Sequence, residues 1–144
     1  MYLFVIDHPY HYEAENLCRV FFPFDKVVTL RDPAEAGAPQ ARTVYTAIRD
    51  ERYIVRVEDE DGETAREEDR IAEDEYGLMS LLFSALRAHT GKTPRWGMLT
   101  GIHPIKLLRQ LTERHGAEEA NRLFREKYFV SEEKAALAAR TLKS

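Results

Sequence analysis

The chain has 144 residues, of which 44% are hydrophobic and 32% charged, and its formal net charge is −4. This mixture is typical of a folded globular protein and excludes a disordered chain, and no apolar run reaches the ~20 residues that a membrane-spanning helix needs. Cys18 is the single cysteine, which excludes a disulfide framework, and the first residues lack a signal-peptide pattern, so we expect a cytoplasmic protein.

The charge is divided unevenly along the chain. Residues 1–91 carry 10 Lys and Arg against 19 Asp and Glu, a net charge of −9, whereas residues 92–144 carry 11 against 6, a net charge of +5. A change of this size predicts two parts with different surroundings. We therefore expect a small α+β domain over residues 1–91 and a helical segment over residues 94–144.

The first domain begins with alternating strand and helix signals. The short apolar run Tyr2–Ile6 predicts a buried strand, because it is bounded by His8 and Pro9. Residues 13–22 fit an amphipathic helix that ends before Pro23, and residues 26–30 are a second strand candidate.

A two-residue hydrophobic period follows. It predicts antiparallel strands over residues 43–49 and 52–58, with a very polar edge strand from Glu63. Asp50 and Glu51 are predicted as the first turn. Asp61 and Gly62 give the better turn signal and are predicted as the central residues of a type I′ turn, where both need positive φ. Residues 73–89 then fit a helix that lies on the sheet and ends at Gly91.

The rest of the chain has a helical period throughout. One helix is expected to begin at Pro104 and end at Gly116, the next to cover residues 118–128, and the last to be capped by Ser131. The fold class is therefore predicted as α+β, with a small, mainly antiparallel sheet and two packed helices, followed by a three-helix segment.

The stretch PRWGMLTGIHPIKLL, residues 94–108, is unlike the rest of the chain. It is no Walker A loop, because the Gly that the motif needs five residues before Gly91 is replaced by Leu86. It is no dinucleotide fingerprint either, since no strand leads into it. A looser anion site near the N-terminus of the next helix stays open, with Lys106 and Arg109 close by. We favour the alternative that its glycines form a tight turn and Trp96 packs at a joint between domains.

No catalytic or metal-binding residue is predicted. His8 and His11 are separated by Pro9, so they are expected to serve as caps or surface residues rather than as zinc ligands. Cys18 lies on the apolar side of a predicted helix and is expected to be an inert core thiol. The acidic runs over residues 58–63 and 67–69 are interpreted as solvated turns and faces, with no acid–base pair among them.

Nucleic-acid binding is the competing hypothesis. In it, Trp96 and Tyr128 would stack bases on a basic surface. The basic residues expected on that surface are Arg95, Lys106, Arg109, Arg114, Arg122 and Arg125. The overall pI of about 5.8 and the Glu residues among these cations count against it. We keep an RNA-binding or protein-interaction module as the alternative and do not expect nucleic acid as the partner.

Two segments resemble the region that precedes the catalytic barrel in radical SAM oxygen-independent coproporphyrinogen III oxidases (dehydrogenases) of the Firmicutes type. The first carries the Trp-Gly-x-Leu-Thr-Gly-Ile-Arg-Pro-x-Lys pattern of that family, and its matching residues are Trp96, Gly97, Leu99, Thr100, Gly101, Ile102, Pro104 and Lys106. The second carries a REKY-x-V-S-x-E-K pattern, and its matching residues are Arg125, Glu126, Lys127, Tyr128, Val130, Ser131, Glu133 and Lys134. The resemblance covers residues 94 to about 142, while residues 1–91 match only in general layout.

The chain departs from the family in two ways. His103 stands where relatives carry Arg, and an imidazole cannot replace a guanidinium that grips a carboxylate through two hydrogen bonds. The Cys-x3-Cys-x2-Cys set that holds a [4Fe–4S] cluster in the family is also missing, since this chain has one Cys. The resemblance therefore implies an N-terminal accessory region, with the cluster and S-adenosylmethionine belonging to the full-length oxidoreductase.

What the resemblance implies for function is an expectation about the whole protein. We expect a role in porphyrin and heme biosynthesis, through oxidative decarboxylation without oxygen, with a non-catalytic role for this chain. Its expected partners are its own radical SAM barrel and a porphyrinogen substrate, which Lys106 or Arg109 would contact. The candidate contact residues are Trp96, Gly97, Thr100, Gly101, His103, Pro104, Lys106 and Arg109.

Overall fold

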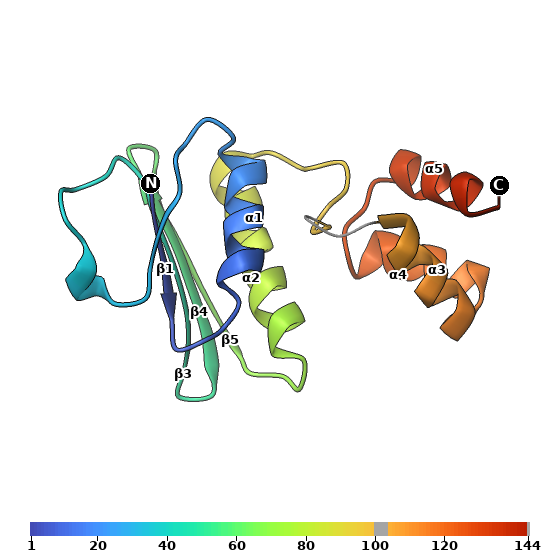
Figure 1. Ribbon diagram of the computed structural model, residues 1–144, viewed down its shortest axis with the longest axis horizontal. Helices are drawn as coiled ribbons and strands as arrows, with labels where there is room; N and C mark the ends of the chain where they lie inside the picture. The colour runs from blue at the N-terminus through green and yellow to red at the C-terminus, as the bar shows by residue number, and fades with distance from the viewer. Residues whose placement is uncertain (100–103, 144) are drawn as a thin grey trace. The chain divides into compact units, whose positions relative to one another are not determined.

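The computed structural model describes residues 1–99 and 104–143 (Figure 1). The chain forms two compact units, Met1–Lys92 and Thr93–Ser144. We call the first the sheet unit and the second the helical unit. None of the helices in the described ranges combines the length and the apolar character needed to cross a membrane.

The sheet unit contains five strands and two α-helices in the order β1, α1, β2, a short 3₁₀ helix η1, β3, β4, β5 and α2. Their bounds are Tyr2–Ile6, His11–Phe21, Val28–Leu30, Pro33–Glu35, Thr43–Arg49, Arg52–Asp59, Gly62–Asp69 and Asp74–Thr90. The strands lie in the sheet in the order β2-β1-β3-β4-β5. The predicted α+β class is confirmed.

The sheet is mixed rather than mainly antiparallel. Strand β1 pairs in parallel with both of its neighbours, β2 and β3, whereas β3, β4 and β5 form an antiparallel meander. The parallel pairs arise because α1 returns the chain to the same end of the sheet before β2 begins, and the connection through η1 does so again before β3 begins. Hydrophobic periods locate strands but do not encode the direction of their neighbours, which is why the sequence missed this pairing.

Helices α1 and α2 lie on one side of the sheet, and the connection that contains η1 lies on the other (Figure 1). The helix-covered face is the core of the unit. It is built from alternate residues of the central strands, such as Leu3, Val5, Val44, Val55 and Val57, all of which are buried. The apolar row predicted for α2 is buried against them, so this helix covers β4 and β5 as expected.

The first hairpin turn is at Asp50 and Glu51 as predicted, but the second differs from the prediction. Asp50 and Glu51, between β3 and β4, both have positive φ, 52° and 59°, as a type I′ turn requires. Between β4 and β5 the two connecting residues are Glu60 and Asp61, and Gly62 is already the first residue of β5. The type I′ prediction at Asp61 and Gly62 is therefore wrong, because the strands pair one residue further towards the turn than the Asp-Gly signal suggested.

The helical unit contains α3 (Pro104–His115), α4 (Ala117–Glu126) and α5 (Glu132–Lys143). As predicted, α3 begins at Pro104, and Ser131 caps α5, because its Oγ accepts a hydrogen bond from the backbone N–H of Lys134 at 3.2 Å. Among the residues that the structure describes, seven buried ones form a small core that the three helices share. These are Leu99, Leu108, Ala120, Phe124, Val130, Ala135 and Ala138.

Candidate functional site

The two segments that carry the family resemblance lie side by side in the helical unit. The backbone N–H of Met98 donates to the carbonyl of Tyr128 at 2.9 Å, and the N–H of Ser131 donates to the carbonyl of Arg95 at 2.9 Å. Two segments that lie about thirty positions apart in the sequence are thus joined by backbone hydrogen bonds. We use "the clasp" for residues 95–99 and 128–131. The structure therefore joins two segments that sequence reasoning treated as separate motifs.

Gly97 is required by the close approach of the two halves of the clasp. Its φ is 59°, a backbone conformation that residues with a side chain rarely adopt. A Cβ at this position would lie 2.1 Å from the carbonyl oxygen of Tyr128, which no side chain can tolerate. The Gly97 N–H donates to Pro94 at 3.0 Å and the Leu99 N–H to Trp96 at 3.1 Å, so the segment turns tightly around this glycine.

Trp96 is half-buried and packs against the core of the helical unit. The ammonium nitrogen of Lys134 lies 5.6 Å from the centre of its ring, which is a cation–π distance. Trp96 therefore ties the clasp to α5, and its expected role between domains stays a prediction. Thr100, Gly101 and His103, the other candidates of this stretch, lie outside the described residues.

Pro104, Lys106 and Arg109 belong to the first half of α3. Lys106 and Arg109 are exposed and three residues apart, so they are neighbours on one face of the helix. In the part of the chain that the structure describes, neither forms an ion pair with a carboxylate. Helix α3 thus presents a pair of cations to solvent.

The basic residues of α4 are engaged instead. Arg122 binds Glu119 and also Glu126, whose carboxylate lies 2.8 Å away, and Arg125 donates to the Oδ1 of Asn121 at 2.9 Å. The hydrogen bond from Arg122 lowers the pKa of the Glu119 carboxyl. These pairs remove two of the six cations that the RNA hypothesis placed on one surface, and that hypothesis stays an untested prediction.

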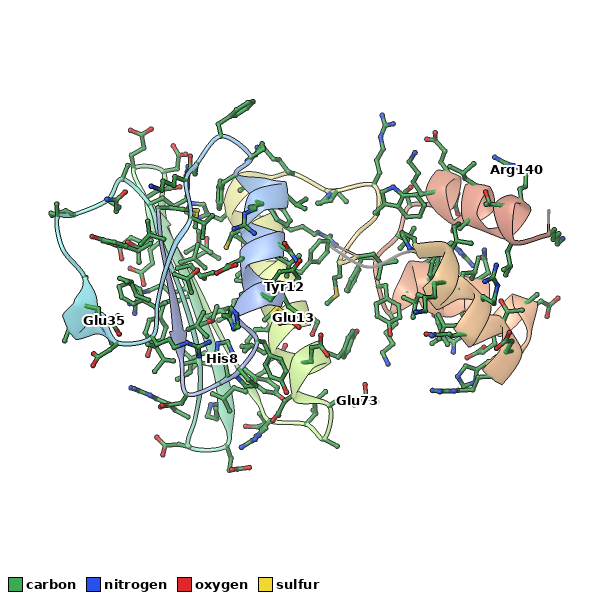
Figure 2. All side chains as sticks on the ribbon, in the orientation of Figure 1. His8, Tyr12, Glu13, Glu35, Glu73 and Arg140 are labelled. Atoms are coloured by element: carbon green, nitrogen blue, oxygen red, sulfur yellow. The ribbon has the colours of Figure 1, made fainter. Side chains whose placement is uncertain are left out.

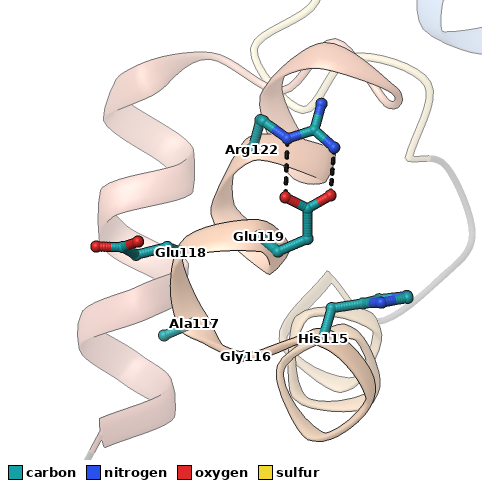
Figure 3. Close-up of a pocket in the computed structure, with 6 residues that line it drawn as sticks. All are labelled: His115, Gly116, Ala117, Glu118, Glu119 and Arg122. Atoms are coloured by element: carbon teal, nitrogen blue, oxygen red, sulfur yellow. Dashed lines mark hydrogen bonds and ion pairs between the residues drawn. The ribbon is translucent and has the colours of Figure 1, made fainter.

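A shallow pocket of about 490 Å³ lies where α3 meets α4 (Figure 3). It is lined by His115, Gly116, Ala117, Glu118, Glu119 and Arg122. Figure 3 shows the guanidinium of Arg122 held by both oxygens of Glu119, so the one cation at this pocket is already neutralised. Sequence reasoning did not single out this pocket, and Gly116 between the two helices was the only local signal for a bend there.

A buried polar network joins distant parts of the sheet unit. The Asp59 carboxylate accepts hydrogen bonds from the Nε2 of His89 at 2.8 Å, the Nε of Arg42 at 2.9 Å and the backbone N–H of Asp61 at 2.9 Å. Arg42 also binds Asp25. The side chains of Asp59 and His89 are 3% and 4% exposed, so the interpretation of residues 58–63 as solvated is wrong at Asp59.

The hydrogen bonds of this network lower the pKa of Asp59 and determine which nitrogen of His89 carries the proton. Burial by itself would raise the pKa of Asp59, but the bonds from His89, from the Asp61 N–H and from Arg42 outweigh it, and the pKa is lowered. Since the ionised carboxylate only accepts, His89 donates from Nε2, and its Nδ1 lies 3.0 Å from the hydroxyl of Thr64. The partners of Asp59, His89 and Arg42 in this network all come from the unit itself, which makes the network a structural clamp rather than an open site.

His8 is buried as well, which corrects the expected surface or capping role (Figure 2). The backbone N–H of Tyr10 donates to its Nδ1 at 3.1 Å, so its proton sits on Nε2 and is donated to the hydroxyl of Thr46 at 2.8 Å. Burial, followed by the charge of Arg31, lowers the pKa of His8 to about 4. Its neighbour His11 has its Nδ1 2.9 Å from Arg31, and within the described ranges no three His, Cys, Asp or Glu side chains are arranged to hold a metal.

Cys18 is fully buried, as expected for a core thiol, and burial raises its pKa to about 12. A [4Fe–4S] cluster needs several Cys thiolates close together, and thiolates form at low pKa. One buried, protonated thiol does not fit this group. The residues of this chain therefore provide no site for the cluster that the family resemblance implies.

Comparison with known proteins gives one partial likeness. A stretch of 53 residues is 43% identical to the oxygen-independent coproporphyrinogen-III oxidase-like protein HemZ of Bacillus subtilis strain 168. The stretch makes up 36% of this chain and spans only 11% of the length of HemZ. No protein-family model and no solved structure matches the chain. The chain is thus similar to a coproporphyrinogen oxidase-like protein over about a third of its length.

Proposed function

We propose that this chain is the N-terminal, non-catalytic accessory region of a longer radical SAM enzyme of the coproporphyrinogen III oxidase type. The clasp is the observation that carries this proposal. It joins the two segments that resemble the family into one hydrogen-bonded unit, and the partial likeness to HemZ supports the same assignment. The radical chemistry is assigned to residues outside this chain, because Cys18 cannot supply a cluster site.

Within this proposal, Lys106 and Arg109 bind carboxylates of the substrate. Coproporphyrinogen carries several propionate side chains, and two cations one helical turn apart suit two such groups. The support is that these cations are exposed and unpaired among the described residues, whereas Arg122 on α4 is held by two carboxylates of its own chain. A charge-assisted hydrogen bond contributes roughly 1.5–3 kcal/mol when it is formed.

The test is steady-state kinetics of the full-length, anaerobically purified enzyme with Lys106→Ala and Arg109→Ala combined. The expected result is a rise in KM for coproporphyrinogen III of at least ~10-fold with a smaller change in kcat, since about 1.4 kcal/mol of lost binding is tenfold. Arg114→Ala is the matched control, because it removes an exposed cation from the last turn of the same helix. Unchanged KM and kcat in the double variant would show that Lys106 and Arg109 do not bind the substrate.

A further inference from the structure

The sheet unit has a face that neither of its two α-helices covers. Both α1 and α2 lie on the opposite side, and only the connection containing η1 reaches the open side (Figure 1). On that connection the N–H of Gly37 donates to the hydroxyl of Tyr2 at 3.0 Å, and the same hydroxyl donates to the carbonyl of Ala38 at 2.6 Å. The connection therefore contacts the Tyr2 end of the face. Ile6 and Ala47 on this face are buried, whereas Phe4, Tyr45 and Ile54 keep part of their surface accessible to solvent.

The open face has an unusual composition for a solvent-facing sheet. Antiparallel strands normally alternate apolar residues inside with polar residues outside. Here one row that crosses the sheet by strand register reads Leu30, Phe4, Tyr45, Arg56 and Ala65. The first four of these side chains are half-buried, with solvent-accessible surface left on each.

The rings of this row lie against one another. The centres of the Phe4 and Tyr45 rings are 6.3 Å apart, and those of Tyr2 and Phe4 are 5.9 Å apart. The guanidinium carbon of Arg56 lies 5.1 Å from the centre of the Tyr45 ring. The result is an aromatic platform on β1 and β3 that Arg56 and Ile54 extend onto β4. Side chains of this kind gain free energy when a partner covers them.

The rim of the platform carries acidic charge that the chain does not neutralise. Glu58 on β4 lies directly opposite Glu63 on β5, and Glu67 follows on the same face of β5. Like charges directly opposite each other destabilise a pair of strands. In the part of the chain that the structure describes, no Lys or Arg pairs with these three carboxylates.

At the other end of the same meander, a pair of like charges is compensated by carboxylates of the same unit. Arg49 and Arg52 also lie directly opposite each other, on β3 and β4. Each has its own carboxylate: Asp7 lies 3.0 Å from Arg49, and Asp69 binds Arg52. The cationic pair is thus compensated within the unit, and the acidic pair is not. The acidic rim is left to be compensated by positive charge from outside.

We propose that the open face of the sheet unit docks a basic amphipathic helix of a partner protein. The apolar side of such a helix covers Phe4, Tyr45 and Ile54, and its Lys or Arg residues reach Glu63 and Glu67 on the rim. A helix suits this surface because a sheet face is normally covered by a helix layer. The acidic rim argues against a nucleic acid, whose phosphates it would repel. This inference concerns the sheet unit alone and does not depend on the function proposed for the helical unit.

The test uses a synthetic helical peptide of Leu and Lys, about five turns long, with the 144-residue chain. Binding is followed by the amide signals of the chain in NMR and by calorimetry at two salt concentrations. We expect saturable binding that shifts the amide signals of β1, β3 and β4, and that weakens as salt increases. A Leu and Glu peptide of the same length is expected not to bind.

Two sets of variants separate docking from unspecific charge attraction. Glu63→Lys combined with Glu67→Lys should lower the affinity for the Leu and Lys peptide at least ~10-fold, since about 1.4 kcal/mol corresponds to a factor of ten. Glu13→Lys combined with Glu75→Lys makes the same charge change on α1 and α2, which lie on the opposite side of the sheet (Figure 1), and should leave the affinity unchanged. Tyr45→Thr, which keeps a strand-forming residue, should weaken binding without altering its salt dependence.

Several outcomes would overturn the proposal. They are the absence of saturable binding, equal losses in both charge-reversal variants, and signal shifts confined to α1 and α2. Tighter binding of an oligouridine probe than of the basic peptide would replace the helix by RNA as the occupant. Concentration-dependent dimerisation of the chain that the peptide displaces would replace the partner by a second copy.

Discussion

The buried network around Asp59 in the sheet unit and the exposed face of α3 in the helical unit use their charged residues in opposite ways. In the sheet unit, Asp59 is buried and each of its hydrogen-bond partners comes from the unit itself, so the network holds β4, α2 and the residue before β3 together. In the helical unit, Lys106 and Arg109 are exposed and unpaired among the described residues. Polar groups whose partners all lie within one unit stabilise the fold, whereas exposed charges without a partner are available to bind another molecule.

The largest expected effect comes from Gly97→Ala. The new methyl group would collide with the carbonyl of Tyr128, and alanine is strained at a φ of 59°. Overpacking and the unfavourable φ together cost about 2–5 kcal/mol of unfolding free energy. Trp96 is the single tryptophan and lies in the clasp, so its fluorescence during urea unfolding reports on the helical unit.

Gly116→Ala is the matched control for this variant. Gly116 also has a positive φ, 88°, but a Cβ there would meet nothing within 4 Å. We expect a loss of only about 1–2 kcal/mol from the backbone conformation alone. If both alanine variants lost the same stability, the close approach of the two segments would not be the reason for Gly97.

Asp59→Asn is expected to cost about 2–3 kcal/mol of sheet-unit stability. One carboxylate oxygen accepts from His89 and the Asp61 N–H and the other from Arg42, so an amide turned either way points its NH₂ at a donor. The exposed Asp61→Asn is the control and should be nearly neutral. Amide exchange of β4 and β5 measures the difference, and equal protection in both variants would refute the clamp.

The pH dependence of the sheet unit gives a third test. The pKa of His8 is about 4 in the folded chain and about 6.5 when unfolded, so the unfolded state binds the proton first. Stability is therefore full above pH 6.5 and is lost as the pH falls towards 4, by about 1–3 kcal/mol. In the His8→Gln variant, the free energy of unfolding should change less between pH 6.5 and pH 4 than in the parent chain. An imidazole of His8 that titrates near 6.5 by NMR would contradict its burial.

A smaller loss is expected at lower pH from Asp59. Its pKa is lowered in the folded state, so its contribution to stability is complete above its unfolded pKa and disappears as the pH falls through the folded value. This acid limb lies below about pH 4. In the Asp59→Asn variant the limb should be shallower than in the parent chain, and an identical limb would show that other carboxyl groups cause it.

Local patterns predicted most elements of the fold. The two-residue period placed β3 and β4 within a residue of their observed ends, and the apolar row of α2 ended at Gly91 as expected. The parallel pairing of β1 was missed because no local signal encodes it. Residues such as Asp59 and His89 were missed for the same reason: one ends a strand, the other lies thirty positions later on a helix, and only packing brings them together.

The candidate site was predictable in part. The sequence singled out Trp96, Gly97, Lys106 and Arg109, but hydrogen bonds between residues 95–98 and 128–131 depend on the helices between them. Exposure also cannot be read from the residue type alone. Arg109 and Arg122 look alike in the sequence, and only the folded helices show that the second is held by Glu119 and Glu126.

Cluster analysis of the protein expressed from its natural reading frame tests most directly whether this chain is part of a longer radical SAM enzyme, as we propose. We expect a Cys-x3-Cys-x2-Cys set beyond residue 144 and about four iron and four sulfide ions per chain after anaerobic purification. Replacing those cysteines by alanine should abolish the iron while leaving the fluorescence of Trp96 and the fold of both units unchanged. A reading frame without this cysteine set, or an iron-free protein, would contradict the proposed function.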